Sequence, residues 1–492
     1  MEKYLLIIRR FSLLFIISLL TAMSITFAQT DIQTGNVSGT WTKTNSPYQV
    51  AGEITIPGGE TLNIEPGVEV IFKGHFKLKI KGRLLAIGSP EDTITFTAQN
   101  TQTGWYGLRF DQISDANDSS KLIYCKIQYG YATTNDDLVG GGILVNNFDK
   151  LLISHCLITK NKTAGDKYSG GGGIGLISSS PRIENNCISY NNVIGGHGGG
   201  IFLTRNSYPI IINNIIYKNQ AFGGGGVSSY KCNPVFINNT IVFNSAGHGG
   251  ALDCLLTFPS FFNTILSKNS SLVGSQVHIS TPGAPNFYFC DVQDGTEAFG
   301  YNHTNEGNYN GTYISNIEND PMFLDTASDN YQLSDNSQCI GAGNDSIQIS
   351  NISYYSPLSD FAGNPRPEPA NSHPDIGAYE KALKNPSTEI KEIQENKSGE
   401  FRLYQNYPNP FNPKTNIEFR TPEFGFVTLK VYDLLGKEVA TLVNEYKPAG
   451  IYSIEIKADN LPSGVYFYQL KTLTADENAE EHTKTKKMLL MK

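Results

Sequence analysis

We predict an all-β fold from this sequence of 492 residues: a parallel β-helix, in which short strands stack coil upon coil, followed by a small antiparallel β-sandwich. Three observations favour this fold. The segment PIIINNIIYKN at residues 209–219 recurs at intervals of about 25 to 31 residues, glycine clusters such as GGGGI separate most copies, and residues 401–492 change to alternating apolar and polar residues. Self-similarity at a short, steady period is typical of a solenoid, and alternation is typical of half-exposed strands.

Each repeat reads as strand, turn, strand, glycine-rich corner and strand. Counted from the first residue of a copy, apolar residues occupy offsets +2 and +7, and asparagines are frequent at +4, +5 and +10. Such segments are too short and too rich in β-branched residues, Gly, Pro and Asn for helical repeats. Stacked coils lie about 4.8 Å apart, so equivalent side chains lie above one another. Copies begin at Ser120, Leu151, Pro181, Pro209, Pro234, Pro259 and Pro285.

The repeated asparagines are predicted to hold the fold and not a ligand. A buried amide without a partner costs free energy, but in stacked coils each amide can pair with its equivalent in the next copy, as an asparagine ladder. Asparagine also tolerates the backbone angles of a tight corner. The expected structural ladder comprises Asn185, Asn186, Asn191, Asn213, Asn214, Asn219, Asn238, Asn239, Asn244 and Asn269.

The seven cysteines indicate no thiolate metal site, because none forms a CxxC motif or a Cys/His set with zinc spacing. Cys125 and Cys156 occupy the same offset in neighbouring copies. Parallel side chains on stacked coils keep the Cβ atoms farther apart than a relaxed disulfide prefers. We therefore expect these two residues to be buried free thiols.

Residues 1–28 are predicted to be a signal peptide that is cleaved between Ala28 and Gln29. Three basic residues in MEKYLLIIRR precede an apolar stretch that ends in small residues at the cleavage positions. A membrane anchor is the alternative, because the apolar stretch approaches the length of a membrane span. We expect the mature chain to be exported and to lack a transmembrane segment. The net charge of −8 argues against nucleic acid as a partner.

The segments that flank the repeats resemble a known family. TLNIEPGVEVIF, GRLLAIGSPEDTITFTA and GWYGLRF resemble the N-terminal coils of bacterial secreted right-handed β-helix proteins. DFAGNPRPEPANSHPDIGAYE at residues 360–380 is similar to the closing coils of the pectate-lyase-like superfamily. The resemblance implies a β-helix over residues 29–382, and a right-handed one, in line with the general handedness of parallel crossovers.

Residues 383–400 are polar and charged without an apolar period, and we expect them to form a linker. Residues 401–492, predicted as a sandwich of about seven strands, resemble the type A sorting domain of the type IX secretion system. The resemblance rests on YPNPFNP, VYDLLGKEVATLV, SGVYFYQL and the basic end TKKMLLMK. It implies transit through the periplasm, recognition of residues 401–492 by the outer-membrane translocon, and then anchoring to surface lipopolysaccharide or release.

Catalytic residues and metal ligands stay unassigned at this point. Pectate-lyase-like enzymes resemble this fold; they hold Ca²⁺ between carboxylates of neighbouring coils and use Arg or Lys as the base. Glycosidases of the same fold use two or three Asp residues. The outward carboxylates of the repeats share no common offset, so no cofactor is evident, with Ca²⁺ implied only for a lyase. These carboxylates are Asp136, Asp137, Asp149, Asp166, Glu184 and Asp253.

A candidate ligand-facing strip lies at offset +9, where basic and aromatic residues alternate. Such a strip suits an anionic sugar polymer, and ordinary exposed lysines are the alternative. The strip comprises Lys160, Tyr190, Lys218, Phe243 and Lys268.

His197 and His248 both precede glycines at the equivalent corner, with the copy that contains Gly223 between them. Two coils correspond to about 10 Å, which is too far for one metal ion to bridge. We therefore expect ordinary corner histidines at these positions.

Five apolar side chains at offsets +1 and +3 are expected to point outward. A contiguous exposed apolar strip is unusual for a soluble monomer, so we expect a loop, the sandwich or a partner to cover it. The five residues are Ile210, Ile212, Val235, Ile237 and Phe262.

The sequence as a whole favours an exported, cell-surface or released β-helix protein that binds glycan or another surface polymer along its lateral face. A polysaccharide lyase or glycoside hydrolase is the first alternative, and a non-catalytic adhesin that binds protein is the second. The fold class alone does not choose among the three.

Overall fold

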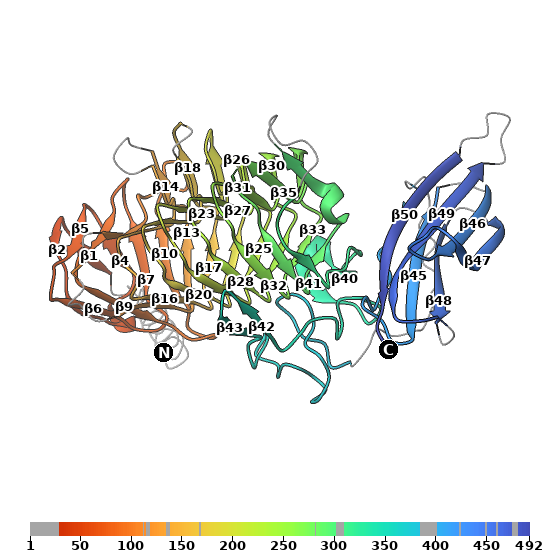
Figure 1. Ribbon diagram of the computed structural model, residues 1–492. Coiled ribbons are helices and arrows are strands. Elements are labelled where there is room, and N and C mark those ends of the chain that lie inside the picture. Colours follow the sequence, from red (N-terminus) through yellow and green to blue (C-terminus); the bar gives the residue numbers. More distant parts are fainter. Residues whose placement is uncertain are drawn as a thin grey trace, which may run out of the picture.

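A parallel β-helix and a smaller β-sandwich lie end to end in the computed structural model (Figure 1). The described helices are the short 3-10 helices η1 (Lys43–Asn45), η2 (Gly295–Ala298) and η3 (Thr326–Ser328). No helix in the described part of the chain has the length and apolar character needed to cross a membrane. The structure describes residues 29–492 except 112, 115–118, 134–137, 167–168, 281, 302–308, 384–400, 423–424, 448–449, 459–460 and 475–480. Of the expected signal peptide, cleavage site and linker, only Gln29 and Leu383 are described.

Three parallel sheets of 11 strands each form the walls of the β-helix, which confirms the predicted fold. The first sheet contains β1 (Thr30–Ile32), β4 (Tyr48–Val50), β7 (Glu69–Phe72), β10 (Ile94–Ala98), β13 (Cys125–Gln128), β17 (Leu157–Thr159), β21 (Cys187–Ser189), β25 (Ile215–Tyr217), β29 (Thr240–Val242), β33 (Ile265–Ser267) and β37 (Asp291–Val292). The second sheet contains β2 (Gly35–Asn36), β5 (Ile54–Ile56), β8 (Leu78–Ile80), β11 (Leu108–Asp111), β15 (Ile143–Asn146), β19 (Ile174–Ile177), β23 (Ile201–Thr204), β27 (Val227–Tyr230), β31 (Leu252–Leu255), β35 (Val277–Ser280) and β38 (Phe299–Tyr301). The third sheet contains β3 (Gly39–Trp41), β6 (Thr61–Ile64), β9 (Arg83–Ile87), β12 (Ser120–Ile123), β16 (Leu151–Ser154), β20 (Arg182–Glu184), β24 (Ile210–Ile212), β28 (Val235–Ile237), β32 (Ser260–Phe262), β36 (Asn286–Tyr288) and β39 (Tyr313–Ile314).

A fourth parallel sheet follows the glycine-rich side of the middle coils. Several of its strands are labelled along the upper side of the solenoid in Figure 1. It contains β14 (Tyr131–Ala132), β18 (Lys162–Ala164), β22 (Asn192–Ile194), β26 (Gln220–Gly223), β30 (Ser245–His248) and β34 (Ser270–Val273).

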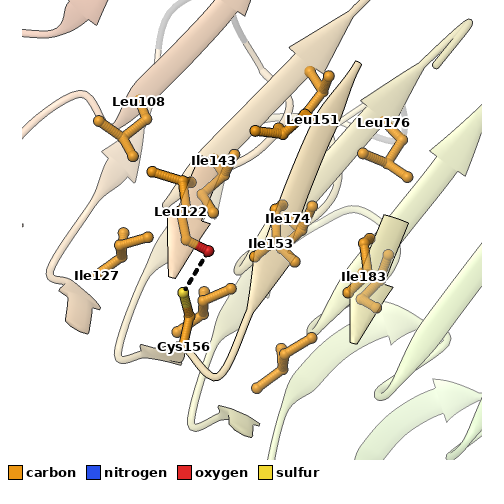
Figure 2. Close-up of a cluster of buried hydrophobic side chains, with 14 of the residues drawn as sticks. Leu108, Leu122, Ile127, Ile143, Leu151, Ile153, Cys156, Ile174, Leu176 and Ile183 are labelled. Atoms are coloured by element: carbon orange, nitrogen blue, oxygen red, sulfur yellow. Dashed lines mark hydrogen bonds between the residues drawn. The ribbon is translucent and has the colours of Figure 1, made fainter. Parts of the chain in front are cut away.

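The core is a continuous stack of aliphatic and aromatic side chains inside the solenoid. Alternate residues of each strand point inward, and the register places Ile211 beside Phe236 and Phe236 beside Phe261 on successive coils. The rings of Phe236 and Phe261 stack with centroids 4.4 Å apart. Figure 2 shows the same arrangement farther toward the N-terminus, where Leu122 and Ile153 come from neighbouring coils. Full burial of each such side chain stabilises the fold by about 1.5–3 kcal/mol.

Two columns of asparagine amides run along the buried corners of the coils. In one column, Asn186 Nδ2 donates to Asn214 Oδ1 (2.9 Å), and Asn214 Nδ2 donates to Asn239 Oδ1 (3.1 Å). In the other, the same donation passes from Asn161 through Asn191, Asn219 and Asn244 to Asn269, each time at 3.0 or 3.1 Å. These amides therefore satisfy one another in the dry interior, where an unpaired amide would be costly.

The asparagines at offset +4 behave differently from the rest of the expected ladder. Asn213 and Asn238 adopt positive φ angles of 53° and 51°, so they form the predicted corner. Their amides lie outside the two columns and contact a later part of the chain: Asn213 Nδ2 donates to the Ser359 carbonyl, and Asn238 Oδ1 accepts from Ser356. Asn238 Oδ1 also accepts from Asn263 Nδ2 of the next coil at 3.4 Å. Asn185 has the same backbone conformation, and its Oδ1 is buried without a partner among the described residues.

The segment 318–383, which we call the return segment, runs back along the outside of the solenoid and adds no coil to it. Its hairpins are β40 (Phe323–Asp325) with β41 (Asn330–Leu333), and β42 (Ser346–Ile349) with β43 (Ile352–Tyr355). Arg366 anchors it: the guanidinium donates to Glu380 and to Asn213 Oδ1 and is fully buried. Residues 360–380, expected as closing coils, therefore form a lateral cover.

The β42–β43 hairpin covers the outward apolar strip. Ile212, Ile237 and Phe262 are 7%, 2% and 0% exposed, and they pack against Ile347 and Tyr354 of this hairpin. Ile210 and Val235, the other two residues of the strip, are partly buried against the same cluster. The expectation that the strip is covered is confirmed fully for three of its five residues and in part for these two, and the cover is a segment of the same chain.

All seven cysteines are free in the structure, as expected for Cys125 and Cys156. The Cys156 thiol donates to the carbonyl of Leu122 at 3.3 Å (Figure 2). Burial, and then the neighbouring Cys156 thiol, raises the pKa of Cys125 well above its usual value, so that thiol stays protonated and unreactive.

The C-terminal unit is a sandwich of two antiparallel sheets, as predicted. One contains β44 (Arg402–Leu403), β45 (Lys414–Thr421) and β48 (Gly450–Lys457), and the other contains β46 (Gly425–Tyr432), β47 (Glu438–Lys447), β49 (Gly464–Thr474) and β50 (Glu481–Leu490). Ion pairs join the sandwich to the last coils: Arg402 with Asp294, Lys486 with Glu318, and Lys484 with Glu297.

Candidate functional site

The outer face of the fourth sheet carries two columns of side chains that follow the stacking of the coils. One column is polar, and register pairs it from strand to strand: Tyr131, Lys162, Asn192, Gln220, Ser245 and Ser270. The other column lies two residues farther along each strand and is mostly apolar. Ala164 and Ile194 are register partners in it, and the next three strands contribute Phe222, Gly247 and Leu272. The register shifts between β22 and β26, where the Phe222 N–H donates to the carbonyl of Gly196.

Three apolar side chains of this second column are exposed to solvent. Ile194 is 47% exposed, Phe222 is 55% exposed and Leu272 is 91% exposed. Their strands belong to three different coils, and the coil between Phe222 and Leu272 has Gly247 at this position. The three side chains therefore form an open, interrupted apolar row with hydrogen-bonding side chains beside it. Elsewhere on the solenoid the outward apolar strip has a cover, whereas this row stands open in the described structure.

A cluster of three histidines and one aspartate lies at one edge of this face. Asp253 and His278 are register partners on β31 and β35, and each points outward from the second sheet. His248 ends β30, and His197 belongs to the same corner column two coils earlier, with Gly223 as the residue between them. The cluster thus combines two columns of the solenoid. His197 and His248 belong to the column of corner residues, and Asp253 and His278 belong to the column of outward residues on the second sheet.

The Asp253 carboxylate is the centre of the cluster. His278 Nδ1 lies 2.9 Å from Oδ1, and His197 Nδ1 lies 3.2 Å from Oδ2. His248 Nδ1 lies 3.4 Å from Oδ1, but its orientation forms no hydrogen bond, and this nitrogen has no other hydrogen-bond partner among the described residues. The Ser228 hydroxyl donates to Oδ2 at 3.3 Å.

Gly223 provides the room in which the imidazoles converge. A Cβ atom at this position would lie 2.4 Å from His197 Nδ1, 2.5 Å from His248 Cε1 and 2.9 Å from Asp253 Oδ2. Real side chains essentially never approach so closely, so any residue larger than glycine would push the two rings apart. The aromatic ring of Phe222 packs edge-on against His248, with centroids 5.0 Å apart.

The electrostatics of the cluster favour an ionised carboxylate. Burial on its own would raise the pKa of Asp253, whose side chain is 6% exposed. The contacts from His197, His248 and His278 outweigh burial and hold the pKa well below its usual value. Asp253 therefore carries a negative charge among three nitrogen donors.

The expectation that two coils keep His197 and His248 about 10 Å apart is wrong for their side chains. Their ring centroids are 5.9 Å apart, because both rings lean over Gly223 toward the same carboxylate. Sequence reasoning does not find His278, because the corner before it, in the copy that begins at Pro259, reads VGSQV and has no glycine cluster. It could be found by aligning the copies on their corners and comparing the strand that follows each corner. This alignment places His278 beside Asp253, and Asp253 follows the corner that contains His248.

Four of the five residues of the candidate strip at offset +9 contact the return segment. Lys218 Nζ lies 2.5 Å from Asp329, and the Tyr190 hydroxyl donates to the other oxygen of this carboxylate at 2.6 Å. Lys268 pairs with Asp320 at 2.6 Å, and Phe243 packs against Tyr331. The fifth residue, Lys160, lies over the ring of Tyr129 within the solenoid.

The outward carboxylates of the repeats stay apart from one another. Asp136 and Asp137 lie outside the described residues. Asp149 accepts from the backbone of Ser180, and Glu184 pairs with Arg182, so both have local structural partners. Among the described members of this set, Asp253 is the one that joins a cluster with two other possible metal ligands.

Fold and surface together define a parallel β-helix protein with a C-terminal β-sandwich. Comparison with family models makes this specific: residues 112–292 match the right handed beta helix region, and residues 405–489 match the secretion system C-terminal sorting domain. The chain therefore carries the sorting domain of the type IX secretion system behind a right-handed β-helix, as the motifs had implied. A C-terminal sorting domain of this kind indicates export to the cell surface or the medium.

The chain is also similar to a solved structure, the enzymatically active domain of tailspike protein 4 of bacteriophage CBA120. The two share 9% sequence identity with a TM-score of 0.32, over 94% of this chain and 64% of that chain. The chain thus spans less than two thirds of the tailspike domain, and we base no functional argument on this likeness. No curated protein matches the sequence.

Proposed function

We propose that this exported β-helix protein binds an extended polymer, a glycan, along the outer face of the fourth sheet. The supporting observation is the open row of Ile194, Phe222 and Leu272 beside the polar column that includes Asn192 and Gln220. A sugar ring has an apolar face and a rim of hydroxyl groups. It is matched by a flat apolar contact with hydrogen-bonding side chains next to it.

The repetition of the face suits a repeating ligand. Successive coils lie about 4.8 Å apart, so the polar column offers one hydrogen-bonding side chain on each of six strands. The strip at offset +9, the candidate that the sequence offers for this role, has two of its lysines engaged by Asp320 and Asp329. The fourth sheet is therefore the better candidate surface.

The test is binding of the purified mature protein to a panel of neutral and anionic polysaccharides, measured by affinity electrophoresis and calorimetry. We expect Phe222→Ala and Ile194→Ser to weaken binding about 5-fold or more, since anchor residues of an interface typically contribute over about 1 kcal/mol each. Leu358→Ala is the matched control, because Leu358 is 87% exposed and lies on the return segment.

Three outcomes separate the alternatives. Binding that Phe222→Ala leaves unchanged would contradict this placement of the glycan. New reducing ends, or unsaturated ends absorbing in the ultraviolet, with or without Ca²⁺, would identify a hydrolase or a lyase. Binding to no polysaccharide, with retention on intact cells that is lost after protease treatment of those cells, would favour the protein-binding adhesin.

The delivery route has its own test in a host that possesses the secretion machinery. Deleting residues 405–489 is expected to leave the β-helix in the periplasm, whereas the full chain reaches the cell surface or the medium. Fractionation followed by protease accessibility of intact cells measures this. Release by a lipopolysaccharide-disrupting wash would support anchoring to lipopolysaccharide.

A further inference from the structure

The cluster of three histidines and Asp253 beside the fourth sheet is not explained by glycan binding along that sheet. One donor atom each from His248, Asp253 and His278 lie within 4.8 Å of one another. Two imidazoles and a carboxylate with donor atoms this close together are a donor set that borderline transition metals prefer. A buried ring nitrogen in a structural hydrogen-bond cluster is expected to form a hydrogen bond, yet the buried His248 Nδ1 forms none among the described residues.

We propose that His248, Asp253 and His278 bind one divalent transition-metal ion, Zn²⁺ in the first instance. In a tetrahedral site with metal–ligand bonds of about 2.0–2.1 Å, neighbouring ligand atoms are about 3.3–3.4 Å apart. His248 Nδ1 and His278 Nδ1 lie 3.4 Å and 2.9 Å from Asp253 Oδ1, and the three donor atoms lie within 4.8 Å of one another, so side-chain rotations can bring them to that spacing.

The surroundings of the three ligands are those of a built site. His197 and Ser228 both contact Oδ2 of Asp253, at 3.2 Å and 3.3 Å, which leaves Oδ1 directed at His248 and His278. Partners of this kind fix the orientation of a ligating carboxylate and raise metal affinity. Gly223 keeps the space between the rings free of a side chain.

Three protein ligands leave a fourth coordination position for water or for an oxygen of a bound molecule. The side chains of His248 and His197 are 21% and 22% exposed, so this side of the cluster is open to solvent. The ion would also tie β30 and β31 of one coil to β35 of the next, and its binding should stabilise the fold.

The first experiment uses the full mature chain without a polyhistidine tag. After dialysis against a chelator and then against buffer with Zn²⁺, we expect one zinc per chain by elemental analysis and a higher melting temperature than in the chelator. Co²⁺ in place of Zn²⁺ should give the visible absorption of a four-coordinate nitrogen and oxygen site. If the dialysed protein takes up no zinc and Co²⁺ gives no such band, the proposal is wrong.

Variants locate the ion. His248→Ala and His278→Ala should each weaken zinc binding about 100-fold or more, and Ser228→Ala, which removes a partner of the ligand Asp253, about 10- to 100-fold. His155→Asn and Cys187→Ser are controls: His155 lies at another corner, and Cys187 is the least buried thiol. Both should bind zinc as the wild type does. Unchanged affinity in His248→Ala would overturn the assignment even if the protein binds zinc elsewhere.

Discussion

Asn214 illustrates why an amide can lie in a dry core without cost. Its side chain donates to Asn239, accepts from Asn186, and also reaches the carbonyls of Ile183 and Ile212. Every hydrogen-bonding group of the amide is therefore satisfied, as burial requires. Asn185, by contrast, occupies offset +4 of its copy and lies outside the two amide columns.

We expect Asn214→Ala to lower the free energy of unfolding by about 2–4 kcal/mol, because it leaves buried donors and acceptors on the two neighbouring coils without partners. Chemical denaturation followed by circular dichroism measures this. The matched control is Asn185→Gly, which suits the φ of 55° at that corner and should cost less than about 1 kcal/mol. Equal effects of the two variants would contradict the structural role of the column.

Asp329 gives a second expectation at the scale of the residue. Burial raises the pKa of its carboxyl, but hydrogen bonds from Lys218, Tyr190 and Tyr331 outweigh this effect and lower the pKa below 3.8. A lowered pKa means that the carboxylate stabilises the fold above pH 3.8 and that the contribution is lost as pH falls through the folded value.

Asp329→Asn should therefore destabilise the protein by about 1–2 kcal/mol at about pH 7, and the difference from the wild type should vanish in acid. Denaturation midpoints between about pH 3 and pH 7 provide the measurement. Asp320→Asn, which removes an exposed partner of Lys268, should have a clearly smaller effect. A difference that persists undiminished at the lowest pH would refute the ion-pair explanation.

The residue scale also shows where sequence reasoning ends. The columns of Asn186, Asn214 and Asn239 could be read from a repeat with a constant offset. The convergence of His197 and His248 could not, since it depends on side chains leaning across Gly223. Register fixes where a Cα lies, but the direction of an imidazole depends on its partner, and the partner aspartate belongs to a different column.

At the scale of the element, the strands and their order were predictable, and the cover was not. Equivalent strands recur at short intervals in the sequence, so the strand order and the pairing of neighbouring coils can be predicted from the repeat alone. The return segment makes contacts such as Ser356 with Asn238 and Arg366 with Asn213, across 118 and 153 residues of sequence. The sequence indicated a cover only indirectly, because an outward apolar strip would be unusual if it were left exposed to solvent.

The β42–β43 hairpin should detach when its apolar contacts are removed. Ile347→Ser combined with Tyr354→Ser takes away the side chains that pack on Ile212, Ile237 and Phe262. We expect faster amide exchange over residues 346–355 and increased binding of an apolar dye, with β24, β28 and β32 still protected. Ile352→Ser is the control, because Ile352 is 56% exposed. Unchanged exchange in the hairpin would show that these contacts do not hold it.

At the scale of the whole molecule, charge holds the sorting domain against the last coils. Arg402, Lys484 and Lys486 of the sandwich face Asp294, Glu297 and Glu318 around a cleft of about 220 Å³. The pairs are partly exposed, so salt should weaken them. Tyr407 adds an apolar contact with the return segment, where its ring packs beside buried residues.

The double variant Arg402→Glu and Lys486→Glu should separate the two units, because both pairs become repulsive. Small-angle scattering is expected to show a larger radius of gyration than for the wild type, and the wild type should approach it as salt is raised. Lys457→Glu, whose lysine pairs with Glu455 within the sandwich, should leave the scattering unchanged. An unaltered radius for the double variant would mean that other contacts dominate.

The solenoid is modular from Pro209 onward, where successive copies begin at Pro209, Pro234, Pro259 and Pro285. The stretch from Pro209 to Asn233 is one whole module, because the next copy begins at Pro234. Duplicating such a module would lengthen both outer columns by about 4.8 Å, while each interior amide keeps an equivalent neighbour. Reach along a chain-like target can thus change in whole steps during evolution, without redesign of the interior.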